Sequence, residues 1–273
     1  MRPSIASLVL LPLLGCATPA PPRRHLAAPP PPELAPLVAT PVPAPTNPAA
    51  EPAPSGVVVS RDGRTRTRRG PCQPDAPAPT TALVACTTGA DGHAREWSDP
   101  DGGALLDVYD GAALITRDGE VFRFDIDLAR ETPLSLPEPT ARWLRAGFTA
   151  SGMLVGLVRT GTLRDPRTSW VHGPGAGPLA MEDVPVDADD IDTADDTAVC
   201  VGAGTGAAVS ALGWRRRITF PSPGPHAVSS AQTVRRAGER VRCDAGRCVV
   251  DGMWVVQLSH TGDTNDPTSA NFR

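Results

Sequence analysis

The chain beyond residue 55 consists of short apolar or alternating stretches separated by turn-forming residues. The clearest example lies at 112–126. There Leu114-Ile115-Thr116 leads through Asp118-Gly119 into a run, Glu120 to Ile126, that alternates polar and apolar residues. A period of two residues is typical of a β-strand, and Asp-Gly between two such runs predicts a tight hairpin. We therefore predict two antiparallel strands in this segment.

Similar strand-like runs recur along the chain, and turn residues such as Asp91-Gly92 and Gly173 to Gly177 separate them. The runs are Val57–Ser60, Ala82–Cys86, Met153–Val158, Thr168–His172, Thr197–Val201, Ile218–Phe220, Cys248–Val250 and Met253–Leu258. Helical periodicity is confined to Thr140–Ala146 and Ala207–Trp214, each no more than a turn or two long. The sequence therefore predicts an all-β domain over residues 56–273.

Hairpins with Gly-rich turns, each followed by a Pro/Gly-rich connector, recur in units of 35 to 45 residues. The units are Ala104–Arg142, Trp143–Val186, Asp187–Gly224 and Pro225–Leu258. This period resembles that of the blades in β-propeller proteins, which implies a small propeller of short antiparallel hairpins. Five short blades would fit residues 56–273. A β-sandwich or an irregular β-barrel is the alternative fold.

Exposed strand edges promote aggregation, so a ring of small sheets must be closed. In propellers, the two ends of the chain often close the ring by pairing in one blade. Val57–Ser60 is the first strand-like run after residue 55, and Trp254–Leu258 is the last strong one. We therefore predict that Val57–Ser60 pairs within the final blade rather than with its neighbour in sequence.

The first fifteen residues have the pattern of an export signal. Met1-Arg2-Pro3 carries a positive charge, Ile5 to Leu14 is apolar, and Gly15 is a small residue at the cleavage position. Leu13-Leu14-Gly15-Cys16 resembles the lipobox of bacterial lipoproteins. The resemblance implies that residues 1–15 are removed and that Cys16 is lipidated, with palmitate among the acyl chains. It also implies anchoring in the bacterial cell envelope, and Ala17 after the cysteine is typical of lipoproteins sent to the outer membrane.

Residues 16–55 are predicted to be a disordered linker between the lipid anchor and the domain. Of the 39 residues from Ala17 to Ser55, 14 are proline and 10 are alanine. Such a composition buries too little apolar surface to offset the entropy lost on ordering, and proline favours an extended chain. The segment would serve as a stalk that holds the domain away from the membrane.

Five cysteines remain after Cys16. Cys243 and Cys248 flank a predicted four-residue turn, Asp-Ala-Gly-Arg, which would bring them within disulfide reach across a hairpin. Cys72 and Cys86 bracket a Pro-rich loop and are the second predicted pair. Cys200 is left over, within an apolar run, as a buried free thiol. Zinc is disfavoured because no Cys-x-x-Cys occurs.

The charge pattern excludes a nucleic-acid partner, since the net charge is −4. Arginine clusters at 61–69, 215–217 and 235–242 are interpreted as solvated strand faces and loops. Acidic residues crowd between Glu182 and Asp196, and we interpret this stretch as a solvated connector. The alternative is a structural calcium site formed by Asp187, Asp189, Asp190 and Asp192, although EF-hand spacing is absent. No other cofactor is expected.

Two further patterns bear on chemistry. Gly202-Ala-Gly204-Thr-Gly206-Ala207 matches a dinucleotide-binding turn, but the βαβ context is missing and a Gly-rich β-turn is favoured. The candidate catalytic histidines are His93, His172, His226 and His260, and none lies in a recognisable hydrolase motif. We therefore predict a non-catalytic binding or scaffolding module, with an envelope protein or glycan as partner. The alternative is an envelope hydrolase whose site is assembled from distant residues.

Overall fold

The structure, a computed structural model, describes residues 33–41, 56–73, 82–162, 165–174, 177–194, 197–210, 215–220, 233–244 and 246–258. Every regular element in these ranges is a β-strand, which confirms the predicted all-β class. No helix long and apolar enough to cross a bilayer occurs among these residues. The predicted signal segment 1–15 and Cys16 lie outside the described ranges.

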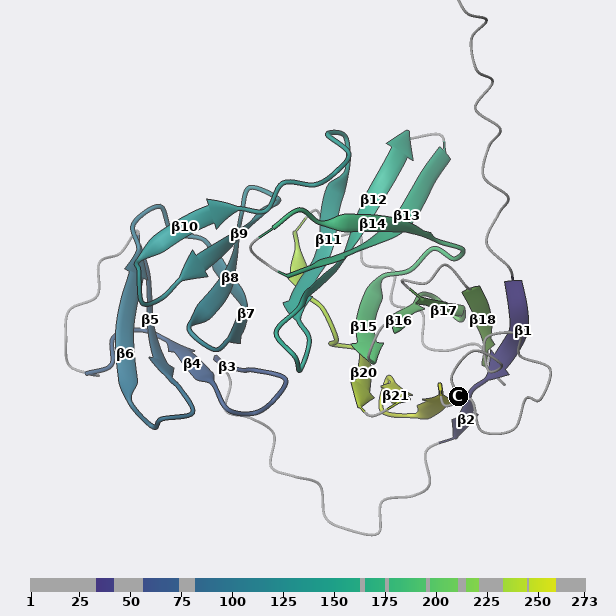
Figure 1. The fold of residues 1–273 in the computed structure, drawn as a ribbon, viewed down its shortest axis with the longest axis horizontal. Helices are drawn as coiled ribbons and strands as arrows, with labels where there is room; N and C mark the ends of the chain where they lie inside the picture. The colour runs from purple at the N-terminus through teal and green to yellow at the C-terminus, as the bar shows by residue number, and fades with distance from the viewer. Residues whose placement is uncertain are drawn as a thin grey trace, which may run out of the picture. The chain divides into compact units, whose positions relative to one another are not determined.

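The strands form five small sheets that follow one another along the chain (Figure 1). We call them blades 1 to 5. Blade 1 contains β3 (Val57–Val59), β4 (Arg66–Arg69), β5 (Leu83–Thr88) and β6 (Ala94–Asp99). Blade 2 contains β7 (Ala104–Tyr109), β8 (Ala112–Arg117), β9 (Glu120–Asp125) and β10 (Arg130–Pro133). Blade 3 contains β11 (Arg142–Phe148), β12 (Leu154–Thr162), β13 (Asp165–Gly173) and β14 (Ala180–Val184).

Blade 4 contains β15 (Asp190–Ala194), β16 (Thr197–Val201), β17 (Gly206–Ser210) and β18 (Arg215–Thr219). Blade 5 contains β20 (Val241–Asp244), β21 (Arg247–Val250) and β22 (Trp254–Gln257). A two-residue strand, β19 (Arg235–Arg236), joins blade 3 beside β11 in parallel. Consecutive strands in each blade pair in antiparallel fashion, so each blade is a meander. The five meanders confirm the propeller-like pattern, and blades 2 to 5 coincide closely with the four units read from the sequence.

The hairpin predicted at 112–126 forms as β8 and β9, with Arg117 opposite Glu120. Asp118 and Gly119 both have positive φ, 51° and 83°, as a type I′ turn requires. Although polar and apolar residues alternate along β9, the strand has a buried residue on each of its two faces. Val121 packs into a core with Leu154, and Phe124 stacks on Trp97 at a centroid distance of 4.9 Å. A blade is therefore covered by side chains on each face.

Four apolar clusters account for this burial. They are represented by Leu83, Val108 and Ile115 for blades 1 and 2, Leu114, Phe148 and Val171 for blades 2 and 3, Leu157, Trp170 and Ile191 for blades 3 and 4, and Val199, Val241 and Val256 for blades 4 and 5. Each cluster contains residues of two successive blades. Because both faces of a blade are apolar, its strands contain continuous apolar runs.

Neither candidate helix forms within the described residues. Residues 142–146 belong to β11, and 207–210 belong to β17, while 211–214 lie outside the described ranges. These strands have apolar residues on both faces. Over so few residues, such a pattern cannot be distinguished from the apolar pattern of a helix.

Part of the predicted linker is a pair of strands. β1 (Glu33–Val38) pairs in parallel with β18 and extends blade 4, and β2 (Thr40–Pro41) pairs with β22 and completes blade 5. We call residues 33–41 the strap. Leu34, Leu37 and the buried Ala39 pack against the core of blades 4 and 5. The disorder prediction is therefore corrected for these residues, because Leu-Ala-Pro-Leu-Val-Ala supplies enough apolar surface to dock on existing sheets.

The predicted ring closure is also corrected. Val57–Val59 pairs with its sequence neighbour β4, where Val57 lies opposite Arg68, and not with the final blade. A strand from the N-terminal side does complete blade 5, but it is Thr40–Pro41. The turn from Ser60 to Thr65 is closed by backbone hydrogen bonds, which makes the local hairpin the cheaper pairing.

Both predicted disulfides are present in the structure. Cys72 is bonded to Cys86, and Cys243 is bonded to Cys248 across the β20–β21 hairpin. Cys200 is a buried free cysteine on β16, and burial raises the pKa of its thiol. The two predicted disulfides and the predicted free thiol of Cys200 are thus confirmed.

The strap provides a test of how the last two blades are held. In Ala39→Asp, a carboxylate replaces a side chain that is 1% exposed, and an unpaired buried charge is costly. We expect the strap to detach, the free energy of unfolding to fall by about 2 kcal/mol, and chymotrypsin to cleave after Leu34 and Leu37. The matched control is Val38→Asp, whose site is 67% exposed. Equal stability and protection for the two variants would mean that the strap contributes nothing.

Candidate functional site

Charged side chains gather where the first strands of successive blades meet. Strand β7 contacts both β3 and β11, and β15 contacts β20. Asp107 on β7, Arg145 on β11, and Asp190 and Asp192 on β15 are all nearly or fully buried. We call these four residues, with Arg61 and Arg236, the ionic centre. Buried charges require partners, so each must be accounted for.

Asp107 has three hydrogen-bond donors. The backbone amides of Val108 and Phe148 donate to its carboxylate at 2.9 and 2.8 Å, and Arg236 Nη2 donates at 2.6 Å. The same Arg236 nitrogen donates to the carbonyl of Val59 at 2.6 Å. One carboxylate and one guanidinium thereby join blades 1, 2 and 3.

Asp190 is fully buried and is satisfied mainly by backbone. The amides of Gly238, Arg240 and Val241 donate to it at 2.9, 2.6 and 3.1 Å. Arg145 lies 3.8 Å away and donates instead to the carbonyl of Asp189 at 2.6 Å. The segment that leads into blade 5 is therefore held on the first strand of blade 4.

Asp192, on blade 4, is in contact with blade 1. Arg61, from the β3–β4 turn, forms an ion pair with Asp192 and donates to the carbonyl of Ala237 at 2.7 Å. The amide of Cys243 also donates to Asp192, at 2.8 Å. Arg61 thus contacts blade 4 and the segment before blade 5 from a turn in blade 1.

These contacts correct two sequence interpretations. The acidic stretch is not uniformly solvated, since Asp190 and Asp192 are 0% and 2% exposed. The arginine clusters are not uniformly solvated either, because Arg61, Arg236 and Arg240 form ion pairs whose acidic partners are largely buried. Arg61 and Arg236 pair with carboxylates 131 and 129 residues away, whereas Arg240 pairs with Asp251, 11 residues away.

Burial raises the pKa of Asp107, Asp190 and Asp192 above the usual aspartate value, and the nearby arginines oppose that shift. The arginine partners and the amide donors therefore offset only part of the cost of removing these carboxylates from water. The carboxylates hold the blades together at an energetic cost of their own.

The calcium candidates do not converge on one point. Asp187 is exposed at the surface, Asp189 pairs with Arg240 at 2.6 Å, and Asp190 and Asp192 accept the bonds described above. The described residues contain no group of three or more His, Cys, Asp or Glu side chains placed to hold a metal. Calcium binding stays an untested prediction.

Of the candidate histidines, His93 is exposed at a turn in blade 1. His172 stacks on Trp170 at a centroid distance of 4.2 Å, and its Nε2 lies 3.9 Å from Glu182. His226 and His260 lie outside the described residues. The Gly202–Gly206 segment forms the turn between β16 and β17, which are antiparallel, so the favoured interpretation as a β-turn is confirmed.

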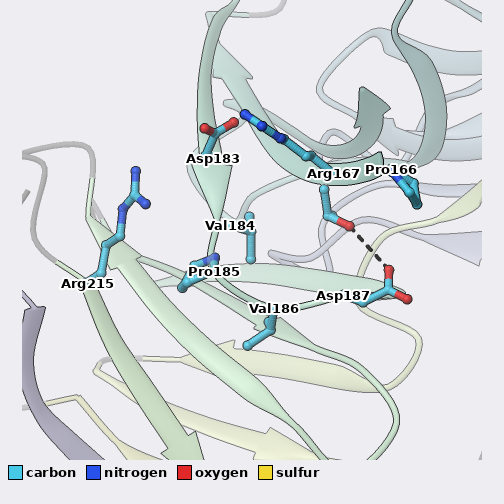
Figure 2. A pocket seen from close by; sticks show the side chains of 9 residues that line it. Pro166, Arg167, Asp183, Val184, Pro185, Val186, Asp187 and Arg215 are labelled. Atoms are coloured by element: carbon cyan, nitrogen blue, oxygen red, sulfur yellow. Dashed lines mark hydrogen bonds between the residues drawn. The ribbon is translucent and has the colours of Figure 1, made fainter. Parts of the chain in front are cut away.

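A groove opens beside the end of β14. It has a volume of about 360 Å³ and is lined by Pro166, Arg167, Thr168, Asp183, Val184, Pro185, Val186, Asp187 and Arg215. Figure 2 shows Arg215 and Asp187 on opposite sides of the three consecutive residues Val184, Pro185 and Val186. Thr168 donates to Asp187 at 3.4 Å, and the exposed Arg167 pairs with Asp165 at 3.2 Å. We call this the β14 groove.

A second groove, of about 480 Å³, lies in blade 2 and its connection to blade 3. The β8–β9 turn and the segment from Pro133 to Trp143 line it, with Leu134, Leu136 and Trp143 among its apolar residues and Glu120 and Glu138 among its acidic ones. Neither groove has a histidine in its lining. Apolar and charged residues both line each groove.

Asp107 and Arg145 were missed by the sequence reasoning, although a signal for them exists. Asp107 is the only charged residue of β7, Ala-Leu-Leu-Asp-Val-Tyr, and Arg145 is the only one in the stretch of β11 that follows Arg142, Trp-Leu-Arg-Ala-Gly-Phe. A charge at such a position must be buried with a partner, since both faces of a blade are covered. The sequence offers no means of naming the partner.

No protein-family model matches the chain, and no curated protein matches it. Among solved structures, virginiamycin B lyase from Staphylococcus aureus is similar with a TM-score of 0.43 and 14% identity, covering 76% of this chain and 82% of that one. Prolyl oligopeptidase B from Galerina marginata has a TM-score of 0.37 and 12% identity, covering 56% of this chain and 24% of that one.

Regucalcin from Agrobacterium tumefaciens has a TM-score of 0.27 and 13% identity, covering 74% of this chain and 88% of that one. Similarity at these levels says nothing about substrate or activity. The propeller-like fold is established by the order and pairing of the strands described above.

The ionic centre can be tested at Asp107. Asp107→Ala would leave Arg236 and two backbone amides without their acceptor, and we expect a loss of about 3–5 kcal/mol in the free energy of unfolding. The matched control is Asp127→Ala, which removes an exposed pair with Arg95 and should cost about 0–1 kcal/mol. Adding Arg236→Met to Asp107→Ala should restore part of the loss. Urea denaturation measures all three, and equal stability of both single variants would contradict a structural role for the centre.

Proposed function

We propose that this chain is a cell-envelope lipoprotein whose propeller-like domain acts as a non-catalytic binding or scaffolding module. The anchor is Cys16, lipidated after removal of residues 1–15, and the destination is the outer membrane. The support is the pattern Leu13-Leu14-Gly15-Cys16 after an apolar run. Several acyl chains on one cysteine suffice for stable attachment without a transmembrane helix.

The disulfides agree with this location. Cys72–Cys86 and Cys243–Cys248 are both closed, and disulfides persist in oxidising compartments such as the periplasm. The strap begins at Glu33, and 16 residues, 17–32, separate it from Cys16. The Pro-rich residues between them would space the domain from the membrane surface.

The observation that carries the binding function is the state of the buried charges. Asp107, Asp190 and Asp192 each accept hydrogen bonds from backbone amides, and arginines neutralise them. A general acid or base needs a proton that it can exchange with a substrate, and these carboxylates are instead engaged in holding blades together. Some of the charges that face solvent, such as Arg167 and Asp187, line the β14 groove, where they are placed to contact a partner.

The partner class follows from the surface. The net charge of −4 argues against nucleic acid. The β14 groove combines apolar residues with charges of both signs, which suits a protein or glycan of the envelope. A hydrolase would need a nucleophile or metal beside a base, and His172 with Glu182 would be the pair to examine.

The anchor is tested by Cys16→Ser in the full chain. We expect the variant to incorporate no radiolabelled palmitate, to retain residues 1–15, and to leave the outer-membrane fraction. The control is Cys200→Ser, which removes a buried thiol with no place in lipidation. Labelling and membrane partitioning of Cys16→Ser equal to the unaltered chain would show that the protein is not a lipoprotein of this kind.

A further inference from the structure

Strand β14 ends its sheet. The strand order in blade 3 is β14-β13-β12-β11-β19, so β14 pairs with β13 on one side, and no described strand pairs with it on the other. A strand edge presents a row of backbone N–H and C=O groups, and an extended peptide can pair with them by adding one more strand. Two of the residues in β14, Glu182 and Asp183, are acidic and not buried.

The β14 groove lies at the C-terminal end of this edge. Val184, Pro185 and Val186 supply an apolar floor directly after the exposed part of the strand. Arg215, on β18 of blade 4, also lines the groove, and Figure 2 shows it to one side of these three residues. The edge and the groove therefore form one continuous surface.

Arg215 differs from the other arginine in the groove. The side chain of Arg167 is paired with Asp165, whereas the half-buried side chain of Arg215 makes no hydrogen bond or ion pair with any described residue. A guanidinium presents a planar fork of donors that matches a carboxylate in a bidentate manner. A half-buried guanidinium beside an apolar floor is therefore placed to bind the carboxylate of a ligand whose neighbouring atoms are apolar.

We propose that the β14 edge and groove bind the C-terminal end of an extended peptide, an inference that rests on the binding function proposed above. The terminal carboxylate would lie on Arg215, and the last apolar side chains on Val184, Pro185 and Val186. The backbone upstream would pair with β14. A basic residue there would face Glu182 or Asp183.

Charge fixes the direction of the peptide. With its carboxylate at Arg215, the peptide runs parallel to β14, because Arg215 lies beyond the C-terminal end of that strand. The opposite direction would place the ammonium of an N-terminus against a guanidinium, and like charges repel. A peptide whose C-terminus is an amide lacks the charge that Arg215 requires.

The test uses the full chain purified in detergent and fluorescent nine-residue peptides that end in Arg-Val-Leu. Each peptide is made with a free C-terminal carboxylate and with an amide, and binding is measured by fluorescence anisotropy. We expect the free acid to bind at least about tenfold more tightly than the amide, since a charge-assisted bidentate contact is lost with the amide. A third peptide, N-methylated at alternate backbone positions, should lose binding because it cannot pair with β14.

Arg215→Gln should abolish the preference for the free acid. Arg247→Gln is the matched control, an exposed arginine on β21 of blade 5, and it should keep the preference. Thermal melting of both variants checks that each is folded. Equal affinity for acid and amide, or a preference that survives Arg215→Gln, would overturn the proposal.

The two proposals fail separately. Loss of peptide binding leaves the lipidation of Cys16 untouched, and a Cys16→Ser protein that stays on the membrane leaves the peptide result untouched. Binding of the N-methylated peptide with full acid preference would show a carboxylate site without strand addition, which also contradicts the proposal as stated.

Discussion

The fold depends on the neutralisation of carboxylates that the blades bury where they meet. Asp107, Asp190 and Asp192 lie on first strands, and each accepts hydrogen bonds from another blade or from the segment between blades 4 and 5. A blade of four short strands has little core of its own, and two-residue strands such as β19 have none. The ionic contacts join segments of different blades, and the apolar clusters supply the burial.

For such contacts, the cost of removing the charges from water opposes the gain from their ion pairs and hydrogen bonds. Burial raises the pKa of the three carboxylates, so desolvation exceeds what the arginines return. In proteins generally, replacing a buried ion pair by apolar residues of similar volume is often neutral or stabilising. What the charges add is uniqueness, because an aspartate that loses its arginine is heavily penalised, whereas an apolar contact tolerates exchange. Blades built from similar hairpins need that distinction, since their apolar faces resemble one another.

Local features of this fold were readable from the sequence, and long-range ones were not. Asp118-Gly119 specifies its turn through positive φ, and Cys243 and Cys248 are placed by a hairpin of six residues, so both follow from neighbouring residues. Arg236 lies 129 residues from Asp107, and Arg61 lies 131 residues from Asp192. No period or spacing encodes such pairs. The strap was missed for a related reason: its prolines resemble those around it, and only the exposed edges of β18 and β22 give its leucines a place to pack.

The parallel pairing of β1 with β18 has a mechanical consequence. Any tension on the chain before Glu33 reaches the strap before it reaches a blade. A force along the axis of β1 acts on all of its hydrogen bonds to β18 at once, in shear. In a hairpin pulled apart from its open end, the hydrogen bonds would instead break one after another. The buried Ala39 and the short pairing of β2 with β22 then pass the load to the final blade. The strap thus links Glu33 to the last described strand, β22, so that force applied at Glu33 is resisted by blades 4 and 5 together.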